Sequence, residues 1–92
     1  MSSVGAQIKV EGLVQGVGFR FFCHRLAIQL NLTGWVRNNH DDSVSVWAEG
    51  DRSQIEELIK NLKSGPRAAV VRDVKIKWLP FSGKFKDFEV VR

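Results

Sequence analysis

The chain has 92 residues, of which 43% are hydrophobic and 26% are charged, and this balance excludes a disordered protein and suits one soluble domain of two packed layers. No apolar run approaches the roughly 20 residues that cross a bilayer, so the sequence predicts no transmembrane helix. The formal net charge of +4 favours anionic partners, but the basic residues form no block of about five or six, which argues against nucleic acid.

The first predicted element is a strand that leads into a glycine-rich loop. Apolar and charged residues alternate from Ile8 to Gly12, which is the period of a half-buried strand. Three glycines then fall among the seven positions from Gly12 to Gly18, so a loop is predicted there. Residues 1–6 are predicted to form a flexible N-terminal tail.

A helix is predicted from Phe19 onwards, because the apolar spacing lengthens to that of one helix face. Asn31 tolerates a left-handed backbone and is predicted to end this helix. The face turned to the core is predicted to carry Phe22, Cys23, Leu26, Ala27 and Leu30.

Two paired strands are predicted next. The segment from Thr33 to Asn38 is typical of a strand, and so is the alternation of Val44, Val46 and Ala48 with Ser43, Ser45 and Trp47. The link from His40 to Asp42 is short and polar, as in turns between antiparallel neighbours. These two strands are therefore predicted to pair directly.

A second helix and two strands complete the chain. Asp51 and Gln54 have the spacing of a capping box, and Gly65 followed by Pro66 is predicted to end the helix. Its apolar stripe consists of Ile55, Leu58, Ile59 and Leu62. Strands are predicted from Val74 to Trp78 and, after a turn, from Phe88 to Val90.

The order of the first six of these elements, βαββαβ, predicts the fold class. Each helix has one apolar stripe and a polar outer face, so both helices should cover the same side of one sheet. The sequence therefore predicts an α+β fold, a ferredoxin-like two-layer sandwich with an antiparallel sheet and two helices on one face. Residues 1–92 are expected to form a single domain.

The loop before the first helix has the features of an anion site. It lies between a strand and a helix N-terminus, where unpaired N–H groups and the helix dipole favour negative charge. Its glycines permit a backbone whose amides point into one concavity, and Arg20 adds a planar cation. The run lacks the Gly-Lys-Ser/Thr of a P-loop and the third glycine of a dinucleotide fingerprint.

The run Val14–Arg20, together with Gly34–Asn38, resembles the paired signature of the acylphosphatase family. The resemblance extends through Ser43-Val44, Glu49-Gly50 and Gly65-Pro66, and so covers nearly the whole chain. It implies an enzyme that hydrolyses the carboxyl-phosphate bond of acyl phosphates, giving a carboxylate and inorganic phosphate. It also implies that neither a metal nor a cofactor takes part.

The resemblance further implies roles for individual residues. Arg20 would bind the phosphoryl oxygens and Asn38 would hold the attacking water, which makes these two the predicted catalytic residues. The backbone amides that cradle the phosphate would come from Gln15, Gly16, Val17, Gly18, Phe19 and Arg20. This chain has Asp42 where the family usually places a glycine, and a left-handed backbone there would cost about 1 kcal/mol.

Other residues that could carry chemistry are assigned to the fold. Cys23 and His24 are neighbours on a helix and point about 100° apart, so they do not form a nucleophile and base pair. The two histidines, with Asp41 and Asp42, have no recognised metal-ligand spacing. The phenylalanines that follow the glycine loop are predicted to pack in the core.

A cytoplasmic monomer with a small-molecule substrate is the expected form of the protein. A lone cysteine cannot form an internal disulfide, and the N-terminal residues have no basic run followed by an apolar stretch. An alternative stays open, namely a non-catalytic module on the same fold that binds anions or nucleic acid. Release of phosphate from acetyl phosphate would separate the two.

Overall fold

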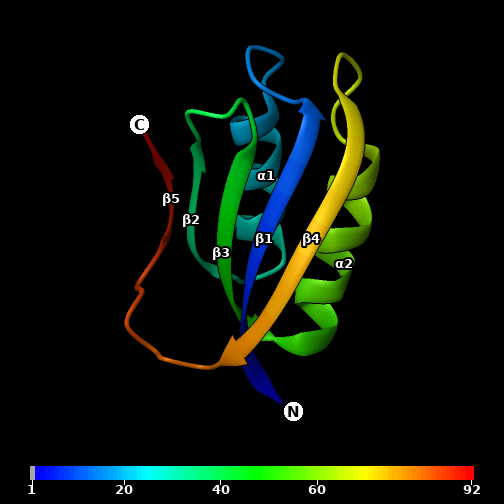
Figure 1. Ribbon diagram of the computed structural model, residues 1–92. Helices are drawn as coiled ribbons and strands as arrows, with labels where there is room; N and C mark the ends of the chain where they lie inside the picture. Colours follow the sequence, from blue (N-terminus) through cyan, green and yellow to red (C-terminus); the bar gives the residue numbers. More distant parts are fainter. Residues whose placement is uncertain (1) are drawn as a thin grey trace.

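The computed structural model describes residues 2–92 as one sheet with two helices on one face (Figure 1). The strand order is β4-β1-β3-β2-β5. This is the predicted ferredoxin-like α+β sandwich. In chain order, the elements are β1 (Ser3–Leu13), α1 (Phe19–Gln29), β2 (Thr33–Asn38), β3 (Val44–Asp51), α2 (Arg52–Ser64), β4 (Val70–Pro80) and β5 (Phe88–Val91).

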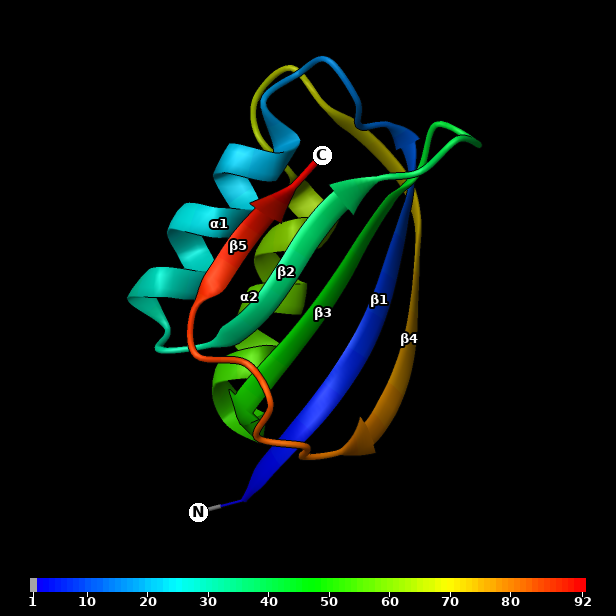
Figure 2. The ribbon, with the colours of Figure 1, turned by 90° about the vertical axis from the view of Figure 1, so that its left-hand side faces the viewer.

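The sheet is mixed, so the prediction of an antiparallel sheet is wrong for one pair of strands. β1 pairs antiparallel with β3 and β4, and β2 pairs antiparallel with β3. β5 runs parallel to β2, from Gly34 opposite Phe88 to Arg37 opposite Val91. The connection after β4 crosses to the far edge of the sheet before the chain turns back, which gives β5 the direction of β2 (Figure 2).

A buried carboxylate holds this crossing connection. Glu49 of β3 is 0% exposed and accepts hydrogen bonds from Ser82 Oγ at 2.7 Å and from the amides of Ser82 and Gly83 at 3.1 Å. A buried carboxylate needs such donors because it has lost its water. The bonds attach the connection to the sheet, and β5 then ends beside the first turn of α1 (Figure 2).

The predicted flexible tail is for the most part a strand. Ser3 and Val4 pair with Asp51 and Gly50 of β3, and Ala6 is fully buried. The small residues at this end show no alternation, so the ladder with two neighbouring strands could not be read from their pattern. Met1 lies outside the described residues.

The start of α2 and the ends of both helices lie where local signals indicate. Asp51 caps α2 by accepting a hydrogen bond from the Ser53 amide at 3.0 Å, and Gly65 follows the helix with a φ of 71°. Asn31, after α1, has a φ of 57°. These are the residue types that prefer N-cap and left-handed positions.

The core lies between the sheet and the helices. α2 buries its predicted stripe in full, whereas α1 buries Phe19, Cys23 and Ala27 most deeply and leaves Phe22 and Leu26 half-buried at the margin. Within residues 2–92, neither helix is long and apolar enough to cross a membrane.

The turn between β2 and β3 contains a strained residue. Asp42 has a φ of 71°, as its position in place of glycine predicted. We expect Asp42→Gly to raise the free energy of unfolding by about 0.5–1 kcal/mol, because glycine adopts this backbone without a steric penalty. Urea unfolding measures the change. His40, in the same turn but without a positive φ, is the control, and His40→Gly should not stabilise. No gain from Asp42→Gly would contradict the expectation.

Candidate active site

The loop between β1 and α1 borders a small hollow of about 140 Å³. Its lining comes from the loop, from the first turn of α1 and from the end of β2, three segments that meet at one end of the sandwich (Figure 2). The lining residues are Val14, Gly16, Gly18, Phe19, Arg20, Phe21 and Asn38.

Two glycines shape this loop through their backbone. Gly16 and Gly18 have φ angles of 74° and 77°. A Cβ added at either position would meet nothing within 4 Å, so space does not require glycine there. The positive φ does, because other residues adopt that region at a cost.

The backbone amides of the loop donate to no acceptor within residues 2–92. Among residues 2–92, the first amide of this region that donates a hydrogen bond is that of Phe22, to the Gly18 carbonyl 3.0 Å away. The N-cap residue, Gly18, has no side chain to cap the helix. The amides from Gln15 to Phe21 are thus free to bind an anion at the positive end of the helix dipole.

Arg20 is a half-buried cation that has no carboxylate partner in the described part of the chain. Its Nη1 donates a hydrogen bond to the Val91 carbonyl of β5 at 3.3 Å. The ion pairs among residues 2–92 use Lys9, Arg52 and Lys75. The guanidinium has five N–H donors, so one bond to Val91 leaves most of them for a ligand.

Asn38 is the last residue of β2, opposite Val44 of β3, and lines the same hollow as Arg20. Its neighbour Arg37 is exposed and lies over the Trp35 ring, with its guanidinium carbon 4.8 Å from the ring centroid. Strand alternation therefore separates Arg37 from the hollow, as expected from the sequence.

Most of the predicted site residues meet at this hollow. Gly16, Gly18, Phe19, Arg20 and Asn38 all line it. Two do not line it, since Val17 packs against the core and the Gln15 side chain bonds to the turn after β2.

Two lining residues, Val14 and Phe21, were not among the predicted site residues. Phe21 lines the hollow and is 72% exposed, so the prediction that it packs in the core is wrong. The spacing of the phenylalanines could have shown this. Two residues along a helix correspond to a rotation of about 200° around its axis, so Phe21 points away from the core in which Phe19 is buried.

A second and larger hollow, of about 530 Å³, lies beside the same loop. Its lining includes the carboxylates of Glu11, Asp41 and Asp42, with Arg72 as its one cation. Three negative groups repel a phosphate dianion. The smaller hollow, which contains Arg20 and no acidic side chain, is therefore the better phosphate site.

Comparison with protein families identifies this combination of loop and fold. The model of the family described as acylphosphatase matches residues 6–90. The chain belongs to the acylphosphatase family. The family and the acyl phosphate hydrolysis predicted from the sequence are thereby confirmed.

Relatives and solved structures agree with the assignment to the acylphosphatases. The acylphosphatase of Syntrophotalea carbinolica is 48% identical over 90 residues, which cover 98% of each chain. The structure of the Bacillus subtilis acylphosphatase has a TM-score of 0.93 at 31% identity and covers 97% of this chain and 99% of that one. The Coxiella burnetii acylphosphatase gives 0.91 at 35% identity, over 97% and 93%.

The remaining candidate groups of this acylphosphatase lie outside the hollow. Within residues 2–92, no three His, Cys, Asp or Glu side chains gather in a group that could hold a metal ion. Cys23 is 0% exposed, and burial raises the pKa of its thiol to about 12.

The buried thiol leads to a labelling prediction. A thiol must ionise to the thiolate before it reacts. We expect Cys23 of the folded protein to resist alkylation by iodoacetamide at pH 8, and Cys23 of the urea-unfolded protein to react fully. Mass spectrometry over time measures both. Equal labelling rates in the two states would contradict the prediction.

Proposed function

We propose that the small hollow binds the phosphoryl group of an acyl phosphate. The observation that carries this proposal is the run of amides from Gln15 to Phe21 without acceptors in the described chain, at the N-terminus of α1. Oriented amides and a helix dipole bind phosphate oxygens well. Arg20 adds positive charge with a fork geometry that suits two oxygens of one phosphoryl group.

Asn38 is the group that we assign to the attacking water. A neutral amide is too weak a base to remove a proton, but it can donate and accept hydrogen bonds and so orient water. The water oxygen forms a bond to phosphorus while the bond from phosphorus to the acyl oxygen breaks. The electron pair leaves with the carboxylate, and a phosphoryl oxygen takes the proton of the water.

This small set of groups suffices because of the leaving group. The conjugate acid of a carboxylate has a pKa of roughly 4 to 5, comparable to Asp or Glu, so the carboxylate departs without a general acid. What remains is to position the water and to stabilise charge on the phosphoryl oxygens, which dominate phosphoryl transfer in general. The amides, Arg20 and Asn38 supply both.

Broad acceptance of acyl groups follows from the size of the hollow. At about 140 Å³, it has room for little more than the phosphoryl group, so the acyl part extends past the rim where Phe21 is exposed. We expect similar kcat values across a panel of acyl phosphates with different acyl groups. Widely different rates would overturn this part of the proposal.

The experiment that tests the function measures phosphate release from acetyl phosphate with EDTA present. Turnover by the wild type that is insensitive to the chelator supports the proposal. A folded protein that binds RNA in a salt-sensitive way but shows no turnover would instead support the non-catalytic alternative. The monomeric state and the cytoplasmic location stay predictions, and sedimentation can measure the oligomeric state.

A further inference from the structure

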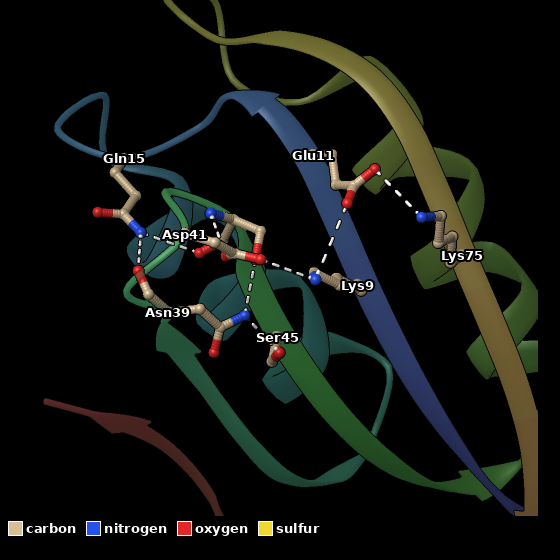
Figure 3. Close-up of polar contacts among 8 residues, drawn as sticks. Lys9, Glu11, Gln15, Asn39, Asp41, Ser45 and Lys75 are labelled. Carbon is tan, nitrogen blue, oxygen red and sulfur yellow. Dashed lines mark hydrogen bonds and ion pairs between the residues drawn. The ribbon is translucent and has the colours of Figure 1, made fainter.

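The Gln15 side chain reaches from the glycine loop to the turn between β2 and β3 (Figure 3). Its Nε2 donates to the Asn39 carbonyl at 2.8 Å and to the Ser43 carbonyl at 2.9 Å. Both partners are acceptors, so only the NH₂ group of the side chain can face them. Both of its hydrogens are used, and the contact is therefore a two-point clamp.

The two carbonyls belong to residues next to the pair of Asn38, the residue assigned to the water, and Val44. Asn38 pairs with Val44 at the end of the ladder between β2 and β3. Asn39 follows Asn38, and Ser43 precedes Val44, so the clamp holds the chain directly after one partner and directly before the other. The Asn39 amide also donates to the Ser43 carbonyl at 2.8 Å, which closes the turn.

The turn is held firmly on its other side. The Asn39 side chain donates to the hydroxyls of Ser43 and Ser45 at 2.8 and 2.7 Å. Lys9 of β1 pairs with Asp41 at 2.8 Å (Figure 3). Within residues 2–92, the bonds of Gln15 are the hydrogen bonds that join the glycine loop to this turn. Loss of the clamp would thus free the loop from a turn that stays in place.

We infer that Gln15 is a positioning residue that sets the distance between the phosphate loop and Asn38. This inference rests on the proposed function, because it assumes that the phosphate lies in the loop and that Asn38 holds the water. Gln15 does not itself line the small hollow that Arg20 and Asn38 border. It acts through the turn, and a misplacement of about 1 Å can cost about 10²-fold in rate.

Gln15→Ala tests the inference through a split between kcat and phosphate binding. We expect kcat to fall by about 10²-fold, while the inhibition constant of inorganic phosphate changes by less than about 3-fold. In a protein that already carries Asn38→Ala, the further substitution Gln15→Ala should lower kcat only slightly. The effects of two residues that act through one another are not additive. Full additivity of the two substitutions, or a wild-type kcat in Gln15→Ala, would overturn the inference.

Gln15→Glu separates the hydrogen bonds from the shape of the side chain. An ionised glutamate has the same size but no donor, whereas a protonated one recovers one donor. The adjoining hollow is lined by Glu11, Asp41, Asp42 and Arg72, and the three carboxylates favour protonation of the new glutamate. We expect the kcat of Gln15→Glu, relative to wild type, to rise as the pH falls from about 8 to 5.

A control and a contrast complete the test. Lys75 belongs to the same polar network through its 3.5 Å pair with Glu11 but does not touch the loop, so Lys75→Ala should keep wild-type kcat. The ratio of the kcat of Gln15→Ala to that of the wild type should not change with pH. If the same ratio for Gln15→Glu also stays constant with pH, the inference is overturned. A failure of the proposed function would give a different result from a failure of this inference, because Asn38→Ala would then keep its activity.

Discussion

Arg20→Ala is expected to remove nearly all acyl phosphate hydrolysis from a protein that stays folded. The guanidinium lines the hollow and has no carboxylate partner among residues 2–92, so its charge is available to the phosphoryl oxygens. Loss of one donor to a developing oxyanion costs about 10²–10³-fold in rate. The fold loses one 3.3 Å bond to Val91, a contribution of about 1 kcal/mol.

Steady-state kinetics on acetyl phosphate, with circular dichroism to check folding, measure this loss. Because Arg20 contacts the phosphoryl oxygens in the ground state as well as in the transition state, the inhibition constant of phosphate should rise along with the fall in kcat/KM. Arg37→Ala is the matched control, since Arg37 is exposed and outside the hollow, and it should behave as wild type. Folded Arg20→Ala with activity close to wild type would refute the assigned role.

Asn38→Ala is expected to lower kcat by a comparable factor, about 10²–10³-fold, with a different signature. The side chain is assigned to the water and not to the phosphoryl group, so phosphate should inhibit the variant as it inhibits the wild type. Asn38 closes the ladder to Val44 through its backbone, which alanine preserves. The fold should therefore survive.

The comparison of the two variants separates the two roles. Turnover and phosphate inhibition are measured side by side for wild type, Arg20→Ala and Asn38→Ala. If phosphate binding weakens in Asn38→Ala as much as in Arg20→Ala, Asn38 binds the phosphoryl group. If folded Asn38→Ala hydrolyses acetyl phosphate at a near-normal rate, the Asn38 side chain does not hold the water.

Local signals in the sequence were sufficient for the helices and for the loop. Asp51 begins α2, and Asn31 and Gly65 follow the ends of α1 and α2, because each residue type satisfies a backbone requirement within a few residues of itself. The glycine loop could be found for the same reason, since Gly16 and Gly18 both need a positive φ. Arg20 and Asn38 came from the family resemblance, and both line the hollow.

Features that depend on distant partners were missed. Strand β5 is parallel to β2, and the connection before it is held by Glu49, which is 33 residues from Ser82 along the chain. The clamp from Gln15 joins residues 24 and 28 positions apart. No periodicity or turn signal carries such pairings, so Gln15 could be predicted as part of the loop but not as its link to Asn38.

Titration of inorganic phosphate into ¹⁵N-labelled protein tests the central claim most directly. The account predicts that the amide signals from Gln15 to Phe21 shift together and saturate at the concentration at which phosphate inhibits turnover, and that Arg20→Ala weakens both. Amide signals of the loop that stay unchanged, while inhibition is complete, would show that phosphate binds elsewhere and would contradict it.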